Sequence, residues 1–304
     1  MKSTSKITIP ELEMFGHSSM NAVKAFLLLF GYEMKQLKSK FPTNSIGHLH
    51  GYQVSLLENL MHSVSTYVVV VEESQDYLVA SSILRTLIDG ISVYHLIYHA
   101  DTKDETALRH YLYILDGISQ KLEIESRHPL RKTDKIKEQE YNALAERLSF
   151  MRNNLNEAKE FCYRAIRNLN IYTTRKATIE KLLYKRNWKF KSLDDSKGYK
   201  WSELHDLLPS KFHRLYSDFC NYLSQYVHGL SMSNLTIDIE DKDIYEPLSD
   251  NIILILNFIH ESMTHDFGVD ISFLTTGLIE SDNFRAYLSY CNESHKKELL
   301  QINI

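Results

Sequence analysis

The stretch that most constrains the fold runs from residue 77 to residue 100, a helix-length segment that is mostly apolar. Its only permanent charges are Arg85 and Asp89, which are four residues apart and therefore share one face of a helix. Two charges are tolerated inside a protein only when they are paired and hydrogen-bonded. The segment therefore predicts a buried helix that forms either the structural centre of the fold or a polar site within it.

Turn-forming residues are scarce, with 10 glycines and 5 prolines in a chain of 304 residues. Because sheets with many hairpins need more of them, this composition favours a few long helices. Apolar residues also recur at three- and four-residue steps through most of the chain, which is the period of a helix. We expect an all-α fold, a helical bundle, with helices over residues 11–40, 52–73, 77–100, 209–229, 251–266 and 282–301.

The longest periodic pattern lies between residues 103 and 171. Its second arm carries four heptads that begin at Tyr141 and end near Leu169. The pattern predicts a projecting antiparallel coiled-coil hairpin, whose second helix has about 36 residues and a length of about 54 Å. We interpret the chain as a single helical domain, residues 1–304, in which a basic connector at 173–200 follows the hairpin.

The net charge of -4 and the pI near 6.4 give no overall attraction to nucleic acid or to anionic membranes. The three cysteines lie far apart without C-x-x-C spacing, which favours a reducing compartment. The N-terminus lacks the apolar core of a signal peptide, and no run reaches about 18 uninterrupted apolar residues. We therefore expect a cytoplasmic protein without a membrane span.

Common cofactor and metal motifs are missing from the sequence. It contains no P-loop, no G-x-G-x-x-G turn, no G-x-S-x-G elbow and no H-E-x-x-H helix. His95 and His99 share a helical face, but the Glu-x-x-His spacing of di-iron bundles does not occur there. We expect neither a cofactor nor a metal site.

A polar line follows the aromatic stripe of a later helix, where Asn221, Ser224 and His228 are spaced by three and four residues. If this line faces Arg85 and Asp89, the five side chains form a candidate catalytic pocket. Arg85 would bind a phosphate there and His228 would transfer a proton. In the alternative interpretation, His228 bonds locally while Arg85 and Asp89 join helices.

Residues 173–191 contain seven lysines and arginines and one acid, so this segment is strongly basic in a chain whose net charge is -4. Lys185, Arg186, Trp188 and Lys189 interleave cations with an aromatic ring, as a surface for single-stranded nucleic acid does. In the alternative interpretation, this is a solvated helix end whose aromatics dock on the core.

Two segments carry a resemblance to a known family. Residues 82–89 (SILRTLID) and 223–228 (LSQYVH) resemble an uncharacterised bacterial family of all-helical domains, a domain of unknown function, which pairs an Arg-x-x-x-acid helix with a Leu-Ser-x-x-Val-His helix. The resemblance covers residues 52–229 and implies an all-helical fold. Its usual acid is Glu, where this chain has Asp89.

A weaker resemblance is to the HEPN helical domains of prokaryotic defence and toxin systems. Their ribonucleases use an Arg-x(4–6)-His motif at a helix end, where this chain has His228 but no arginine four to seven residues before it. We expect an interaction or assembly protein, in a bacterial defence context, that uses the hairpin to form a homo-oligomer or to bind a protein partner. The alternative is a HEPN-like ribonuclease or RNA-binding protein that uses Arg85 and His228, and a third hypothesis is nucleic-acid binding by the basic segment.

Overall fold

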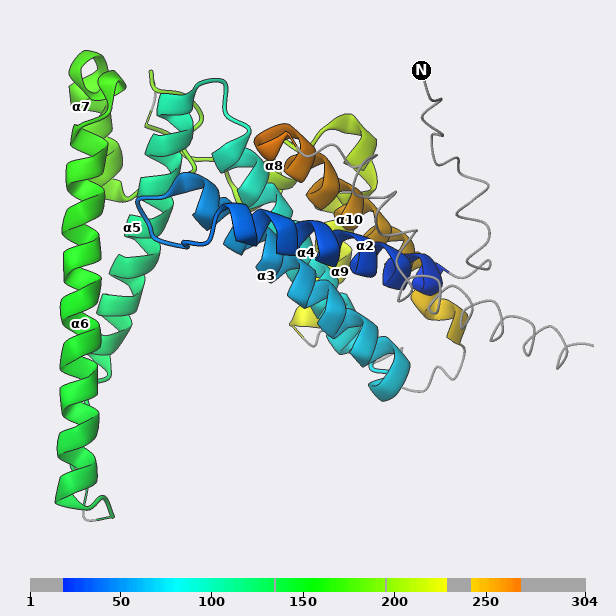
Figure 1. The fold of residues 1–304 in the computed structure, drawn as a ribbon, viewed down its shortest axis with the longest axis horizontal. Helices are drawn as coiled ribbons and strands as arrows, with labels where there is room; N and C mark the ends of the chain where they lie inside the picture. The colour runs from blue at the N-terminus through cyan, green and yellow to red at the C-terminus, as the bar shows by residue number, and fades with distance from the viewer. Residues whose placement is uncertain (1–18, 134, 195, 229–241, 269–304) are drawn as a thin grey trace, which may run out of the picture. The chain divides into compact units, whose positions relative to one another are not determined.

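The structure is a computed structural model that describes residues 19–133, 135–194, 196–228 and 242–268 (Figure 1). Over these ranges the chain is helical and forms no β-strand, so the predicted all-α fold is confirmed. The helices are α2 (Ser19–Lys40), α3 (Leu49–Val69), the π-helical turn η2 (Val70–Ser74), α4 (Tyr77–Tyr98), α5 (Lys103–Arg127), α6 (Glu138–Arg167), α7 (Asn170–Lys185), α8 (Trp201–His205), the 3-10 helix η3 (Ser210–Leu215), α9 (Ser217–Val227), the 3-10 helix η5 (Lys242–Tyr245) and α10 (Glu246–Phe267). The final predicted helix, residues 282–301, lies outside the described residues.

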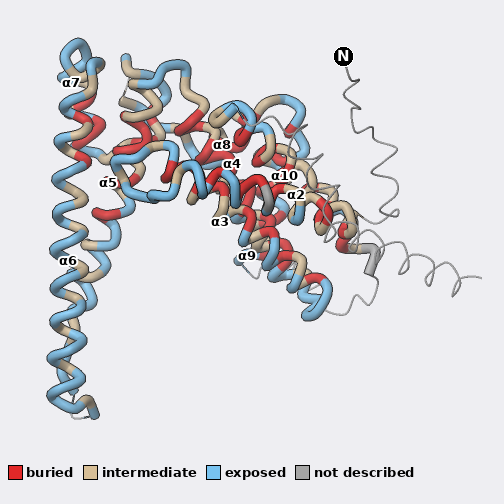
Figure 2. Tube along the Cα trace, in the orientation of Figure 1, coloured by how far each residue is buried: buried red, intermediate tan, exposed pale blue. Residues whose placement is uncertain are grey.

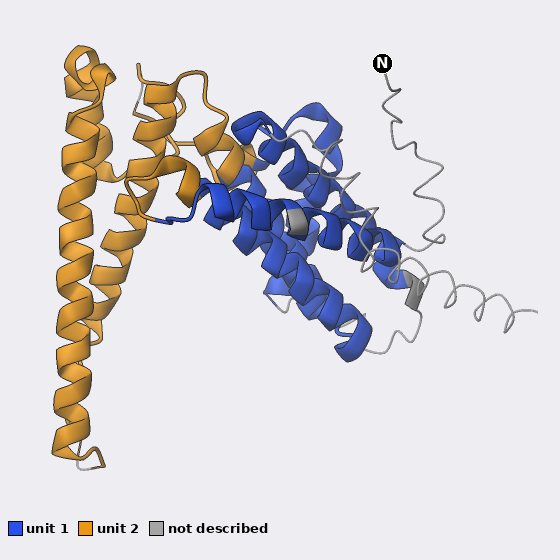
Figure 3. Cartoon of the chain, in the orientation of Figure 1, with its two compact units in different colours: residues 1–44, 53–93, 205–304 blue, residues 45–52, 94–204 orange. Residues whose placement is uncertain are grey.

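The chain groups into two compact units (Figure 3). Unit 1 comprises Met1–Asn44, Gln53–Val93 and His205–Ile304, and unit 2 comprises Ser45–Tyr52 and Tyr94–Leu204. The predicted hairpin and the basic connector both belong to unit 2. The predicted polar pocket belongs to unit 1.

The core of unit 1 forms where one apolar face of each helix turns inward (Figure 2). Gly90 on α4 allows the close approach of α3, because a Cβ atom at this position would lie 2.5 Å from Leu60 Cδ2. The hydroxyls of Tyr67 and Ser249 are 3.0 Å apart and join α3 to α10 inside the core. The fully buried residues include Leu57, Tyr67, Leu84, Ile88, Leu223, Ile252 and Ile259.

In unit 2, α5 packs against both α6 and α7. The second arm of the hairpin is shorter than the sequence predicts, because α6 has 30 residues, about 45 Å at 1.5 Å per residue. Leu169 has extended backbone angles (ψ 142°), so α7 starts as a separate helix at Asn170. The two arms pack together as expected, while a coiled-coil register along them stays a prediction.

The single helix predicted at residues 209–229 is wrong, since the structure has η3, then α9. Tyr216 between them is extended, with ψ −180°, and its hydroxyl donates to the carbonyl of Leu208 at 2.8 Å. The Asp206 carboxylate accepts from the backbone N–H of Ser217 at 3.0 Å, which satisfies a donor at the start of α9. These two tertiary bonds favour the break over a continuous helix.

One helix of the described chain, Leu49–Ser74, is long and apolar enough to cross a membrane. One face of it carries Val54, Leu57, Val64 and Tyr67, all buried within the protein. A core helix of a folded protein meets the same length and composition criteria. The absence of a membrane span and the cytoplasmic location stay predictions.

Candidate functional site

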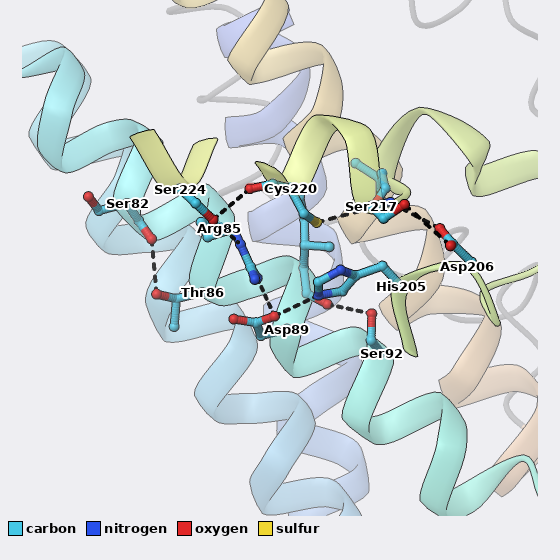
Figure 4. Close-up of polar contacts among 12 residues, drawn as sticks. Ser82, Arg85, Thr86, Asp89, Ser92, His205, Asp206, Ser217, Cys220 and Ser224 are labelled. Atoms are coloured by element: carbon cyan, nitrogen blue, oxygen red, sulfur yellow. Dashed lines mark hydrogen bonds and ion pairs between the residues drawn. The ribbon is translucent and has the colours of Figure 1, made fainter. Parts of the chain in front are cut away.

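The polar cluster of unit 1 is centred on the carboxylate of Asp89 (Figure 4). Arg85, one turn earlier on α4, pairs through Nη1 with Asp89 Oδ1. Arg85 Nε donates to Ser224 Oγ on α9 at 3.2 Å. The structure therefore brings together three of the five predicted pocket residues, Arg85, Asp89 and Ser224.

His205, at the end of α8, completes the cluster. Its Nε2 donates to Asp89 Oδ1 at 2.8 Å, and its side chain is almost fully buried. Nδ1 is also buried and has no hydrogen-bond partner among the described residues, which favours the tautomer with the proton on Nε2. No sequence pattern indicates His205, because 116 residues separate it from Asp89.

The electrostatics of the cluster keep Asp89 ionised. Burial alone would raise the pKa of its carboxyl, but the hydrogen bonds from His205 and Arg85 outweigh this effect, and the pKa lies below its ordinary value. A carboxylate with a lowered pKa is a weak general base near neutral pH. Arg85 in turn is already neutralised by Asp89, so it has little charge left to attract a phosphate.

Ser224 is also occupied within the cluster. Its hydroxyl donates to the carbonyl of Cys220, one turn earlier on α9, at 2.8 Å, while its oxygen accepts from Arg85. A nucleophilic serine needs a base that accepts its proton. Here that proton is directed at a backbone carbonyl, so the geometry supports a structural bond between α4 and α9.

The other two predicted pocket residues, Asn221 and His228, have exposed side chains. Neither forms a side-chain hydrogen bond or ion pair to the cluster in the part of the chain that the structure describes. His228 follows the last residue of α9, where its backbone N–H donates to the Ser224 carbonyl at 3.1 Å. Of the three predicted polar residues on this line, only Ser224 therefore contacts α4.

The basic segment of unit 2 differs from its sequence interpretation in one residue. Trp188 is only 6% exposed, and its Nε1 donates to Asp116 at 3.3 Å, so its ring belongs to the core. Lys185 is exposed, whereas Arg186 and Lys189 are half-buried. The aromatic rings that reach solvent nearby are Tyr184 and Trp201.

The distal part of the hairpin forms a third candidate surface, again within unit 2. Arg152 on α6 donates to Glu125 on α5 at 3.0 Å, which sets the register of the two antiparallel helices. Since α5 ends at Arg127, the turns of α6 before roughly residue 150 extend beyond it. In that part, Leu144 is exposed, and Phe150 at its edge has an exposed fraction of 66%.

The buried cysteines do not provide a reactive group. Burial raises the pKa of the Cys162 thiol and of the Cys220 thiol to about 12 in each case. The thiolate is the reactive form of cysteine, and it is negligible for such groups near neutral pH. Cys291 lies outside the described residues.

No protein-family model matches the chain, no curated protein matches it, and no solved structure matches it. The resemblances to the bacterial helical family and to HEPN domains therefore stay predictions.

Proposed function

We propose that this protein is a non-enzymatic assembly protein whose α5–α6 hairpin pairs with the hairpin of a second copy. The observation that carries the proposal is the partly uncovered seam of α6. Tyr141, Leu144 and Leu148 continue the apolar repeat of this helix past the end of α5, where Leu144 is exposed and the other two are half-buried in the described chain.

The apolar surface of the hairpin is larger than a surface helix needs. Ile124, near the end of α5, is 60% exposed, and Leu144 and Phe150 on α6 are exposed as well. Pairing with another helix would remove these side chains from water, at about 25 cal/mol for each Å² of apolar surface buried. An amphipathic helix with an open apolar face is a common site of self-association.

Charge complementarity favours a second copy in the antiparallel direction. Residues 138–150 of α6 contain three acids and one base, whereas residues 151–167 contain four bases and two acids. Antiparallel pairing of two α6 helices places the acidic half of each beside the basic half of the other. The resulting contact is isologous, as in a closed two-fold dimer.

The test measures molar mass by light scattering after gel filtration. Wild type should elute with about twice the chain mass of 35.6 kDa. The variant Leu144→Glu/Phe150→Glu should be monomeric with an unchanged helical content, because both side chains are exposed. The control Asn156→Glu adds a charge to an exposed position of α6 that lies about 120° around the helix from both Leu144 and Phe150, and it should stay dimeric.

A monomeric wild type at concentrations up to roughly 100 µM would overturn the proposal, since a dimer with a Kd of about 10 µM would then be populated. Dimers that persist in the double variant would show that the hairpin is not the contact. Higher salt should weaken the dimer, because exposed charges at the contact are screened.

RNA cleavage by Arg85 and His228 is the alternative function. Two observations weigh against it: Arg85 is bound to Asp89 and Ser224, and the exposed His228 has no bond to either residue in the described chain. An RNA degradation assay with Arg85→Ala and His228→Ala separates the two functions. We expect no cleavage by wild type, and cleavage lost in both folded variants would favour the alternative.

A further inference from the structure

The basic loop that follows α7 is built as a fixed surface inside unit 2. Buried Arg109 donates through Nη1 to the carbonyls of Trp188 at 3.3 Å and Phe190 at 2.9 Å, and its guanidinium carbon lies 3.9 Å from the centre of the Phe190 ring. Glu105 accepts from Arg109 Nη2 at 2.7 Å and completes the charge pairing. The loop is therefore held by a buried and satisfied cation.

The other side of the loop is closed by Asn187. Its Nδ2 donates to the Ser196 carbonyl at 2.9 Å, and its Oδ1 lies 2.9 Å from the position of a Cβ atom on Gly198. The backbone of Tyr199 donates to the Lys189 carbonyl at 2.7 Å. A Cβ atom at position 198 would displace the Asn187 amide, so glycine at this position keeps the turn closed beneath the cations of the loop.

These cations surround a groove of about 430 Å³, lined by Lys185, Arg186, Lys189 and Lys197, with Asp116 as the one acid among the lining residues that the structure describes. Asp116 already accepts from Trp188 Nε1 and from Gln120 at 2.9 Å. Within the described residues, Lys185 and Lys189 form no ion pair with a carboxylate. The groove therefore holds an excess of positive charge in a chain whose net charge is -4.

Two exposed aromatic rings adjoin lysines of the groove. Tyr184, which precedes Lys185 in the chain, is 90% exposed, and Trp201 is 45% exposed with Lys189 Nζ at 4.7 Å from its ring centre. Tyr184 lines a second groove, of about 610 Å³ between α5, α6 and α7, and Arg186 lines both grooves. An ammonium beside an open ring binds the phosphate and the base of one nucleotide together.

Arg186 supplies an independent observation. It ends α7 in the left-handed conformation, with φ 52°, which favours glycine or asparagine. Its guanidinium donates to the exposed Glu123 at 2.7 Å, a pair that contributes little to stability. Arg186 places a cation at the junction of the two grooves although its backbone conformation costs stability. Such strain is expected where a residue serves binding and not folding.

We propose that this groove, with Tyr184 and Trp201 as stacking platforms, binds single-stranded nucleic acid through its phosphodiester backbone and bases. This function goes beyond assembly and uses other residues. The sequence indicates Trp188 as the ring that stacks on a base. The proposal instead assigns this role to Tyr184 and Trp201, whose rings are open to solvent.

The test is fluorescence anisotropy with labelled oligo(U) and oligo(dT) of about 20 nucleotides, longer than the roughly 4–16 that one such groove covers. Both strands should bind, and the strand with the lower Kd identifies RNA or DNA as the preferred ligand. A duplex of the same length should bind more weakly. Trp201→Ala should weaken binding about tenfold, the effect of one lost stacked base. Lys185→Gln/Lys189→Gln should lower the salt slope by about 1.4, while Lys35→Gln/Lys40→Gln, in unit 1, should leave it unchanged.

A second variant separates binding from folding. Arg186→Gly relieves the left-handed strain, so it should melt at or above the wild-type temperature while it binds the strands several-fold more weakly. No binding of either strand at up to about 100 µM protein, the weak end of non-specific affinity, overturns the proposal. Equal binding of duplex and single strand, or unchanged binding in Trp201→Ala, overturns it as well.

Discussion

Removal of the Asp89 carboxylate should destabilise the protein because it leaves two buried donors without an acceptor. Asp89→Ala deletes the ion pair with Arg85 and the 2.8 Å bond from His205 Nε2. Hydrogen bonds to a charged group contribute about 1.5–3 kcal/mol each. Since the Asp89 side chain is 33% exposed and water can replace part of the contact, we expect a loss of about 2–3 kcal/mol in total.

The assay is urea unfolding followed by circular dichroism, with the free energy of unfolding from linear extrapolation. His205→Ala should lose a similar amount, and the double variant should show a coupling energy of about 1–2 kcal/mol between the two residues. Glu73→Ala removes an exposed acid from the same unit and should stay within about 0.5 kcal/mol of wild type.

The pH dependence gives a second readout of the same cluster. The pKa of Asp89 is lowered in the folded protein, so its stabilisation is complete above the ordinary value near 3.9 and is lost as pH falls through the folded-state value. The difference in the free energy of unfolding between wild type and Asp89→Ala should therefore be constant near neutral pH and should vanish in acid.

Three results would refute this reasoning about Asp89. A change within about 0.5 kcal/mol, or no coupling to His205, would show that the cluster does not join the helices. A variant more stable than wild type would indicate that the site costs stability, as catalytic sites do, and would return Arg85 and Asp89 to the catalytic hypothesis.

Two further predictions concern buried titratable groups in the two units. Burial lowers the pKa of His110 to about 4, and since its Nε2 donates to the Ile46 carbonyl at 2.9 Å, the neutral ring accepts from Tyr98. Its stabilisation should be complete above the unfolded value near pH 6.5 and be lost towards pH 4, so that urea curves of wild type and His110→Gln converge in acid; parallel curves would contradict this. Glu33 is fully buried, and its carboxylate has no hydrogen-bond partner in the described chain, with His260 Nδ1 at 3.9 Å. Glu33→Met should raise the free energy of unfolding by about 1–2 kcal/mol in urea titrations, and a loss of stability would reveal a favourable pair with His260.

Local spacing was sufficient to predict the all-α fold and one half of the polar cluster. Few turn-forming residues and a repeat near 3.6 indicate helices whatever their neighbours are, and Arg85 and Asp89 meet because they lie one turn apart on α4. The excess of lysine and arginine at residues 173–191 is likewise a property of the sequence alone. These features depend on residues within a few positions of each other.

Tertiary structure decided what these local features contact. His205 reaches Asp89 across 116 residues, Asp206 and Tyr216 divide a periodic segment into η3 and α9, and Trp188 turns inward to Asp116. Burial and hydrogen bonding between distant segments depend on how helices pack, which a helical period does not specify. The sequence therefore determined which faces are apolar or charged, and packing determined which of them stay exposed.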